Sequence, residues 1–321
     1  MWPGLYCKQV MPELHPKLAA LAATLHPAPL TPINDPALTK RGIRLSIKRD
    51  ELLHPILSGN KWRKLKYILD HVLHGGYRGI ISMGGAYSNH LHALAYAGRA
   101  LQLPAVALIR GEPPLTLNPT LQDLHDWGMS MHFLSRGAYR ELRQAELPSF
   151  WRQRYPDYFW LPEGGANTLA LAGVAEMHQE LPTDYDWLIL ACGTGTTLAG
   201  LSPGLAAPRR LLGVAAMKHG DFLDHDMRRL LDYPDATQTN WQLALDYHGG
   251  GFACLKPALL QRLHLFEQQH GIRLEPVYTG KVLLAIEDLL NQDFFAPGQH
   301  LIMLHSGGLQ GWRGLSNQPM M

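Results

Sequence analysis

Trp187-Leu-Ile-Leu-Ala-Cys192 is an unbroken apolar run, and it leads directly into the glycines and hydroxyls of Gly193-Thr-Gly-Thr-Thr197. Such a run is typical of a parallel strand that is covered on both faces. The residues that follow have helical spacing, beginning near Thr196. The stretch therefore predicts a buried strand, a loop at its carboxyl end and a helix, the repeating unit of an α/β protein.

Further apolar runs predict the other strands of the fold, at 79–83, 105–109, 129–134, 211–215 and 301–304. Ahead of them, Ile43, Leu45 and Ile47 alternate with polar residues, which predicts a half-buried strand behind the proline-rich segment 27–36. Apolar stripes predict helices at 91–101, 121–127, 169–181, 255–269 and 281–290. Because strands and helices alternate, we expect an α/β fold with parallel sheets.

The composition excludes several classes of protein. The chain has 321 residues, enough for two domains, and its 46% hydrophobic and 17% charged residues suit a compact chain. A net charge of +2 is too small for a nucleic-acid or membrane-surface footprint, and no stretch approaches the ~20 apolar residues of a membrane span. The widely spaced Cys7, Cys192 and Cys254 form no disulfide framework. The N-terminus is unlike a signal peptide, so we expect a cytoplasmic protein.

The loop 193–197 has the chemistry of a phosphate site. Its glycines let backbone N–H groups approach phosphate oxygens, its threonines add donors, and a helix begins there. Leu198 stands where a dinucleotide fingerprint needs a third glycine, and the ending of a nucleotide-binding P-loop is missing. The loop therefore predicts a phosphate monoester, unless it is only a tight turn.

Two more segments carry polar residues at a strand end or a helix start. Ser88-Asn-His90 opens the helix 91–101, where free N–H groups suit a carboxylate, although Ser and Asn also commonly cap helices. His90 and His92 point to different helix faces, so a metal site is not expected. The other segment is His305-Ser-Gly-Gly308, which follows the last predicted strand.

Lys61 lies at the start of another predicted helix and shares an apolar stripe with Leu65 and Val72. Arg63, Lys66 and Asp70 fall on the opposite side, which we expect to face solvent. Two interpretations of the inward lysine stay open. It either extends its amine to the surface from the first turn, or it is desolvated, nucleophilic and able to form a Schiff base with an aldehyde.

Together these features describe a site for pyridoxal 5′-phosphate. From about Pro32 to Gly314 the chain resembles the 1-aminocyclopropane-1-carboxylate deaminase and D-cysteine desulfhydrase family of pyridoxal-phosphate enzymes. Five motifs carry the resemblance in the family order, namely Gly59-Asn-Lys-Trp-Arg-Lys-Leu-Lys66, Ser88-Asn-His90, Gly193-Thr-Gly-Thr-Thr197, Pro276-Val-Tyr-Thr-Gly-Lys281 and His305-Ser-Gly-Gly308.

The resemblance implies a fold, an assembly and site residues. The fold is fold type II, like the tryptophan synthase β-subunit, with two open, twisted, mostly parallel sheets and helices on both faces. A larger domain of residues 1–58 and 165–321 binds the cofactor, residues 59–164 form a smaller domain, and the chain forms a homodimer. The implied cofactor-binding residues are Lys61, Asn89, Gly193, Thr194, Gly195, Thr196, Thr197 and Ser306. The implied substrate-binding residues are Ser88, Asn89, His90, Tyr247, Tyr278 and Thr279.

The resemblance also assigns chemistry to these positions. Lys61 forms the Schiff base and then removes the α-proton, and it is catalytic together with Ser88 and Tyr278. Asn89 hydrogen-bonds the ring hydroxyl, the loop 193–197 holds the phosphate and Ser306 faces the pyridine nitrogen.

Two positions separate the branches of the family. Thr279 and Ser306 stand where the deaminases have Glu and Leu, and His90 stands where they tend to have Gln. This favours a D-cysteine desulfhydrase-like β-elimination from a small amino acid, which gives pyruvate, ammonia and sulfide. The alternative is 1-aminocyclopropane-1-carboxylate deaminase activity, which gives 2-oxobutanoate and ammonia.

Two other classes of protein have some support in the sequence. Gly200-Leu-Ser-Pro-Gly204 matches a serine hydrolase motif, but a helix precedes the serine where the nucleophile elbow needs a strand. A protein that binds the cofactor or an amino acid without turnover stays open, because Tyr87, His92 and the segment 247–252 depart from the family pattern.

Overall fold

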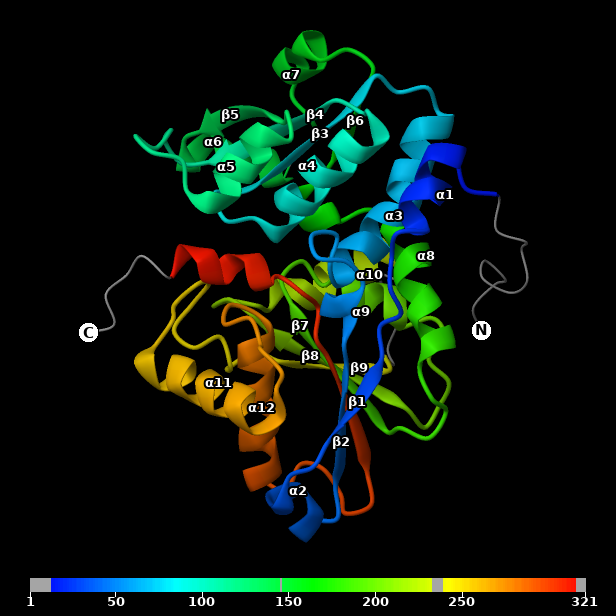
Figure 1. The fold of residues 1–321 in the computed structure, drawn as a ribbon, viewed down its shortest axis with the longest axis vertical. Helices are drawn as coiled ribbons and strands as arrows, with labels where there is room; N and C mark the ends of the chain where they lie inside the picture. Colours follow the sequence, from blue (N-terminus) through cyan, green and yellow to red (C-terminus); the bar gives the residue numbers. More distant parts are fainter. Residues whose placement is uncertain (1–12, 145, 233–238, 316–321) are drawn as a thin grey trace.

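The computed structural model describes residues 13–144, 146–232 and 239–315, and these residues form two sheets (Figure 1). The larger sheet contains β1 (Leu30–Ile33), β2 (Arg44–Lys48), β7 (Trp187–Cys192), β8 (Arg210–Ala215), β9 (Trp241–Ala244) and β10 (His300–Leu304), in the order β1-β2-β10-β7-β8-β9. The smaller contains β3 (Gly79–Gly85), β4 (Ala105–Arg110), β5 (Ser130–Leu134) and β6 (Tyr158–Leu161), in the order β5-β4-β3-β6. Among the strands of the described residues only β1 and β2 pair antiparallel, so the predicted pair of mostly parallel sheets is confirmed.

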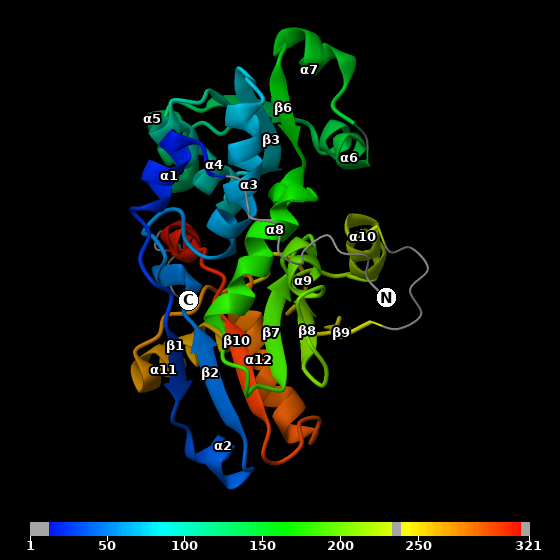
Figure 2. The ribbon, with the colours of Figure 1, turned by 90° about the vertical axis from the view of Figure 1, so that its right-hand side faces the viewer.

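Helices connect the strands and lie on both sides of each sheet (Figure 2). The α-helices are α1 (Pro16–Ala22), α2 (Pro36–Lys40), α3 (Asn60–His74), α4 (Asn89–Leu101), α5 (Pro119–Asp126), α6 (Arg136–Gln144), α7 (Ser149–Arg154), α8 (Leu169–Ala175), α9 (Thr196–Leu201), α10 (Phe222–Leu230), α11 (Pro257–His270) and α12 (Thr279–Asn291). The 3₁₀ turns are η1 (Asp50–Leu52), η2 (Glu163–Gly165), η3 (Glu176–Glu180) and η4 (Leu309–Gly314). Turn chemistry sets several ends, for example in α11, which starts at a proline and stops at the left-handed Gly271.

Alternate residues of each central strand enter different hydrophobic cores. Ile189 of β7 packs in the core formed with α11 and α12, whereas Leu190 packs in the core formed with α9 and α10. In the smaller sheet, Ile80 faces the core shared with α3 and α4, and Ile81 faces the core shared with α6. Both faces of both sheets are therefore covered, which explains the continuous apolar runs in the sequence.

The expectation of a half-buried strand before residue 48 is wrong. Ser46 is 6% and Lys48 is 0% exposed, so the polar side of β2 is also buried. Both buried polar side chains have a buried partner, because Ser46 Oγ lies 3.0 Å from His300 Nε2 and Lys48 Nζ donates to Asp50 Oδ1 at 3.1 Å. The strand is also not the first one, since β1 lies inside the proline-rich segment.

The predicted solvated side of α3 is wrong as well. Arg63 is 3% and Asp70 is 7% exposed. Arg63 forms ion pairs with the buried Asp50 and with the partly exposed Glu180, and Asp70 Oδ1 accepts a hydrogen bond from His15 N at 2.8 Å. The cause is close packing by α8, where a side chain at Gly173 would come within 2.1 Å of the Arg63 carbonyl oxygen. Charge alone does not place a residue at the surface when neighbouring elements supply its partners.

The short strands β6 and β9 and the helices α6, α7 and α10 are not predicted by the sequence patterns. The predicted strand 129–134 corresponds to β5, which is only partly buried because it lies at the edge of its sheet. Such elements are short or amphipathic on an edge, and therefore carry a weak periodic signal.

Within the part of the chain that the structure describes, no helix is long and apolar enough to cross a membrane. No cluster of His, Cys, Asp and Glu in that part is arranged for a metal ion. Cys192 is buried and Cys254 is exposed, both as free thiols, while Cys7 lies outside the described residues. The strands of the smaller sheet all fall between residues 79 and 161, and the division into domains at 58/59 and 164/165 stays a prediction.

Candidate active site

Lys61 is the second residue of α3, and a glycine sets its position. Gly59 precedes the helix with φ of 62°, and a side chain there would lie 1.9 Å from the Ser306 carbonyl oxygen. Only glycine fits this close approach, which brings the start of α3 against the end of β10. The backbone N–H of Asn60 donates to the same Ser306 carbonyl oxygen at 3.3 Å. The sequence Gly-Asn-Lys thus joins the lysine to the serine-glycine-glycine turn.

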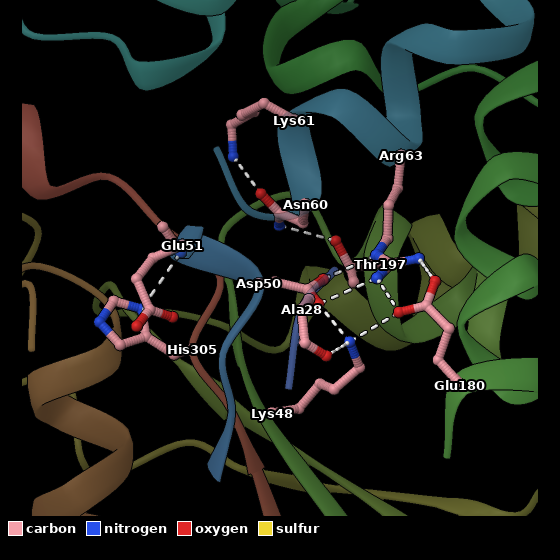
Figure 3. Close-up of polar contacts among 11 residues, drawn as sticks. Ala28, Lys48, Asp50, Glu51, Asn60, Lys61, Arg63, Glu180, Thr197 and His305 are labelled. Carbon is pink, nitrogen blue, oxygen red and sulfur yellow. Dashed lines mark hydrogen bonds and ion pairs between the residues drawn. The ribbon is translucent and has the colours of Figure 1, made fainter. Parts of the chain in front are cut away.

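The Lys61 amine is part of a short polar chain (Figure 3). Its Nζ donates to Asn60 Oδ1 at 2.7 Å, and Asn60 Nδ2 donates to Thr197 Oγ1 at 2.9 Å. Burial lowers the pKa of Lys61 to about 8, and the Glu275 carboxylate opposes the shift. The amine is therefore nucleophilic near neutral pH, which favours the reactive interpretation of the inward lysine.

The glycine-threonine loop has the geometry expected of a phosphate site. Gly195 has φ of 72° and is the N-terminal capping position of α9, as the sequence predicts. Thr194 Oγ1 and Thr196 Oγ1 lie 2.8 Å apart, and no side chain caps the helix. Backbone N–H groups at such a helix start remain available to an anion.

Lys64 is a buried lysine to which no sequence pattern pointed. It is 4% exposed, and its Nζ donates to the Gly164 carbonyl oxygen at 3.1 Å. No carboxylate pairs with it among the described residues, and burial followed by the charge of Lys61 lowers its pKa well below the usual range. A side chain at Gly164 would meet the Thr194 methyl group at 2.9 Å, so Gly164 lies against the loop. A phosphate dianion bound at this loop would supply the negatively charged partner that Lys64 lacks among the described residues.

Asn89 and Gly308 lie near Lys61. Both line a small pocket together with the lysine. A side chain at Gly308 would come within 2.6 Å of Asn89 Nδ2, so glycine is needed where the turn after β10 passes this amide. The Ser306 hydroxyl forms no hydrogen bond to any residue in the described ranges.

The start of α4 confirms the capping interpretation of Ser88. Its Oγ accepts from Leu91 N at 3.2 Å, and α4 begins at Asn89. His90 points into the smaller sheet, where its Nε2 lies 2.8 Å from Ser82 Oγ and its Nδ1 is buried without a partner among the described residues. Burial, aided by two nearby lysines, lowers the pKa of His90 to about 3, so its ring is neutral. The geometry does not bring the His90 ring to the pocket.

Tyr278 lies beside the glycine-threonine loop 193–197. A side chain at Gly193 would touch the Tyr278 ring at 3.3 Å, and burial raises the pKa of the phenol above its usual range. Glu275 orients this residue, because its carboxylate accepts from Val277 N at 2.7 Å and from Tyr278 N at 2.8 Å. Burial raises the pKa of Glu275 to about 7, which the two amides oppose. Thr279 is fully buried and its hydroxyl bonds the Glu275 main chain, so it faces away from the pocket.

Tyr247 is not brought to these residues either. Its hydroxyl donates to Asp288 Oδ2 at 2.7 Å. Asp288 is nine residues along α12 from Thr279, a distance of roughly 13 Å at the helical rise. Within the segment 247–252 it is Phe252 that contacts Tyr278, and its ring lies edge-on to the Tyr278 ring with centroids 5.9 Å apart.

The structure therefore gathers most of the predicted cofactor residues in one place. The exceptions among the substrate-binding predictions are His90, Tyr247 and Thr279. The sequence analysis missed Asn60, Lys64, Glu275 and Gln310. Asn60 and Lys64 could have been found from their places in the Gly59–Lys66 motif, but nothing local in the sequence distinguishes Glu275 or Gln310.

The residues present fit pyridoxal phosphate. A desolvated lysine suits its aldehyde, the loop with Lys64 suits its phosphate, and an amide faces the pocket. These features on two mostly parallel sheets define a pyridoxal-phosphate enzyme of fold type II.

Comparison with known proteins identifies the family. Residues 22–307 match the family described as "Pyridoxal-phosphate dependent enzyme". A Pyrococcus horikoshii protein named "Putative 1-aminocyclopropane-1-carboxylate deaminase" is 28% identical over 93% of this chain and 96% of its own. The Arabidopsis thaliana "Bifunctional D-cysteine desulfhydrase/1-aminocyclopropane-1-carboxylate deaminase, mitochondrial" is 27% identical over 89% of this chain and 77% of its own.

A solved structure agrees with these sequence matches. The crystal structure of an ACC deaminase homologue superimposes with a TM-score of 0.75 and 25% identity, covering 93% of this chain and 96% of that one. The chain belongs to the family of pyridoxal-phosphate dependent enzymes, in the group that contains ACC deaminase and D-cysteine desulfhydrase.

Proposed function

We propose that this enzyme catalyses β-elimination from a small D-amino acid, with D-cysteine as the first candidate, and releases sulfide, ammonia and pyruvate. Bound pyridoxal phosphate supplies the electron sink that lets a proton leave Cα and a thiolate leave Cβ. The observation that carries the proposal is the chain from Lys61 through Asn60 to Thr197, which joins a buried amine of lowered pKa to the glycine-threonine loop.

Each part of the pocket has a proposed task. Residues 193–197 and Lys64 bind the phosphate, Asn89 donates to the ring oxygen and Ser306 faces the ring nitrogen. The Lys61 amine takes the proton from Cα, for which its lowered pKa keeps a neutral fraction available. Because its phenol stays protonated, Tyr278 serves as a hydrogen-bond donor beside the substrate.

The substrate carboxylate has a proposed place at the start of α4. The Ser88 hydroxyl is engaged as the cap, so the binding groups are the amides of Asn89 and His90 in the first turn. Ser88 then acts by holding the helix start in place. This assigns a carboxylate site without the His90 ring.

The choice of β-elimination is supported by Ser306. A hydroxyl at the ring nitrogen donates a hydrogen bond but does not keep that nitrogen protonated, as a carboxylate would. Charge then stays on Cα, which favours expulsion of a β-thiolate. Thr279 supports the proposal less directly than the sequence suggests, because it is buried away from the pocket, and the nearby Glu275 carboxylate is occupied by two amides.

A substrate panel tests the proposal. We expect purified enzyme to release sulfide and a 2-oxoacid from D-cysteine, and far less from L-cysteine or D-serine. The second candidate is 1-aminocyclopropane-1-carboxylate, favoured by the name of the Pyrococcus relative. Turnover of that acid alone would overturn the proposed reaction, and no turnover with a normally bound cofactor would favour a binding protein. Lys61→Ala is the control that loses both the visible cofactor band and turnover.

We also infer a cytoplasmic homodimer from the family resemblance. Sedimentation of the purified protein at several concentrations tests the dimer, and a single monomeric species would contradict it.

A further inference from the structure

Gln310 joins the end of the larger sheet to the start of α4. It lies in η4, two residues after Gly308, and it lines the same pocket as Lys61 and Asn89. Its Nε2 donates to Asn89 Oδ1 at 2.6 Å, and its Oε1 accepts from Thr120 Oγ1 at 2.6 Å. The result is a polar chain from Thr120 through Gln310 to Asn89.

The neighbours of Gln310 determine which way its amide faces. The Arg313 guanidinium, which has only donors, lies 3.4 Å from Oε1, and the Tyr87 carbonyl oxygen, which only accepts, lies 3.4 Å from Nε2. Exchange of the two amide atoms would place like groups against each other at both contacts. The side facing Asn89 is therefore the N–H side.

The orientation of Asn89 follows from that of Gln310. Because Gln310 presents a donor, Asn89 must present its carbonyl oxygen in return. Asn89 Nδ2 is then the group left to face Gly308 and the pocket, and it forms no hydrogen bond within residues 13–144, 146–232 and 239–315. Without a partner such as Gln310, the Asn89 side chain would turn either Nδ2 or Oδ1 toward the pocket.

We propose that Gln310 is a positioning residue that holds Asn89 with its N–H group toward the ring oxygen of the cofactor. The inference rests on the proposed placement of Asn89 at that oxygen. A donor there favours the ionised form of the oxygen, so Gln310 sets the proton affinity of the oxygen and of the nitrogen bonded to Lys61 beside it. The residue that orients Asn89 thus belongs to η4, which lies 221 residues further along the chain.

Gln310→Glu tests the proposal in the holoenzyme. A carboxylate accepts only, so the Asn89 amide should turn and present its oxygen to the ring oxygen. We expect the pH midpoint of the visible cofactor band to rise by about one unit, and cofactor loss to a carbonyl trap to accelerate roughly tenfold or more. The substitution also places a carboxylate beside Arg313, so a purely structural role predicts an unchanged or more stable protein with an unchanged midpoint.

Two further variants keep the test independent of folding. Thr120→Val removes the donor to Gln310 with little change in shape, and should shift the midpoint in the same direction by less. Trp312→Phe is the matched control, because it removes another hydrogen bond of η4, to the Leu274 carbonyl at 3.0 Å, without touching Asn89. It should leave the midpoint unchanged. A shift in Trp312→Phe equal to that in Gln310→Glu would overturn the proposal.

Asn89→Ala separates the two levels of inference. If Asn89→Ala leaves the midpoint unchanged, the placement of Asn89 at the cofactor fails. If Asn89→Ala shifts the midpoint and Gln310→Glu does not, only the role of Gln310 fails. In the Asn89→Ala background Gln310→Glu should add nothing, since its effect passes through the amide.

Discussion

Lys61 illustrates how burial prepares a residue for chemistry. An ordinary lysine, with a pKa of 10.5, is almost wholly protonated near neutral pH, whereas burial lowers that of Lys61 to about 8. Only the neutral amine attacks an aldehyde. We therefore expect the rate of pyridoxal phosphate capture by the apoprotein to rise about tenfold per pH unit below the midpoint and to level off above about pH 8.

Stopped-flow absorbance at saturating cofactor measures this rate. Lys61→Ala is the control, since it should bind the cofactor without the visible band. A midpoint near the ordinary lysine value would show that the amine is solvated, contrary to its position in the structure.

Lys64 makes an opposite pair of predictions for the apoprotein and the holoenzyme. Its amine is buried beside Lys61 without a carboxylate among the described residues, so Lys64→Met should change apoprotein stability by less than about 1 kcal/mol. The same change should weaken cofactor affinity roughly tenfold or more, because a charge-assisted contact to the phosphate is lost.

Thermal unfolding and equilibrium dialysis of the cofactor measure the two effects separately. A large loss of apoprotein stability with unchanged affinity would make Lys64 structural only. The affinity of the site for the cofactor thus depends on side chains such as Lys64, which have no oppositely charged partner among the described residues before the cofactor binds.

At the scale of elements, the turn between β7 and α9 depends on Gly195. Its φ of 72° disfavours any side chain, and a Cβ there would lie 2.7 Å from Met227 Cγ. We expect Gly195→Ala to cost about 1 kcal/mol from the left-handed backbone, plus roughly 1–3 kcal/mol from crowding against α10. Cofactor affinity should fall as well, because the loop amides move.

Gly271→Ala is the matched control, since Gly271 has φ of 66° and nothing within 4 Å of its Cβ position. It should lose only the backbone contribution and keep the affinity for pyridoxal phosphate. Urea unfolding and cofactor titration of both variants make the comparison. Equal affinity in the two variants would mean that the loop is merely a turn.

At the scale of the whole molecule, a buried ion network joins α3 to the larger sheet (Figure 3). Arg63 pairs with Asp50 at 2.6 Å and with Glu180 at 2.7 Å, and Lys48 pairs with both carboxylates. Removing one partner leaves buried charge uncompensated, so we expect Arg63→Ala to lower the free energy of unfolding by about 3–5 kcal/mol.

Arg44→Ala is the control for this prediction, because Arg44 and Asp184 are 61% and 65% exposed in their ion pair. It should cost less than about 1 kcal/mol. Chemical denaturation of both variants gives the comparison, and equal losses would show that the network has no special role. Since Arg63 follows Lys61 on the same helix, Arg63→Ala should also reduce activity.

The sequence by itself determined the class of fold and the centre of the site. Apolar runs such as 187–192 and glycine-rich turns such as 193–197 are local patterns, and their backbone demands follow from nearby residues alone. The same holds for the cap at Ser88, whose hydroxyl accepts from a backbone N–H three residues further along the chain.

Only the tertiary structure decided which polar groups became partners. Arg63 and Asp70 are buried because α8 and the N-terminal segment supply neighbours from distant parts of the chain. Thr279 turns to its own helix start, Tyr247 pairs with Asp288, and Gln310 reaches Asn89 across 221 residues of sequence. Hydrogen bonds and ion pairs act over a few ångströms in space. Partners that are distant in the sequence therefore cannot be identified from their positions in the chain before the two sheets are assembled.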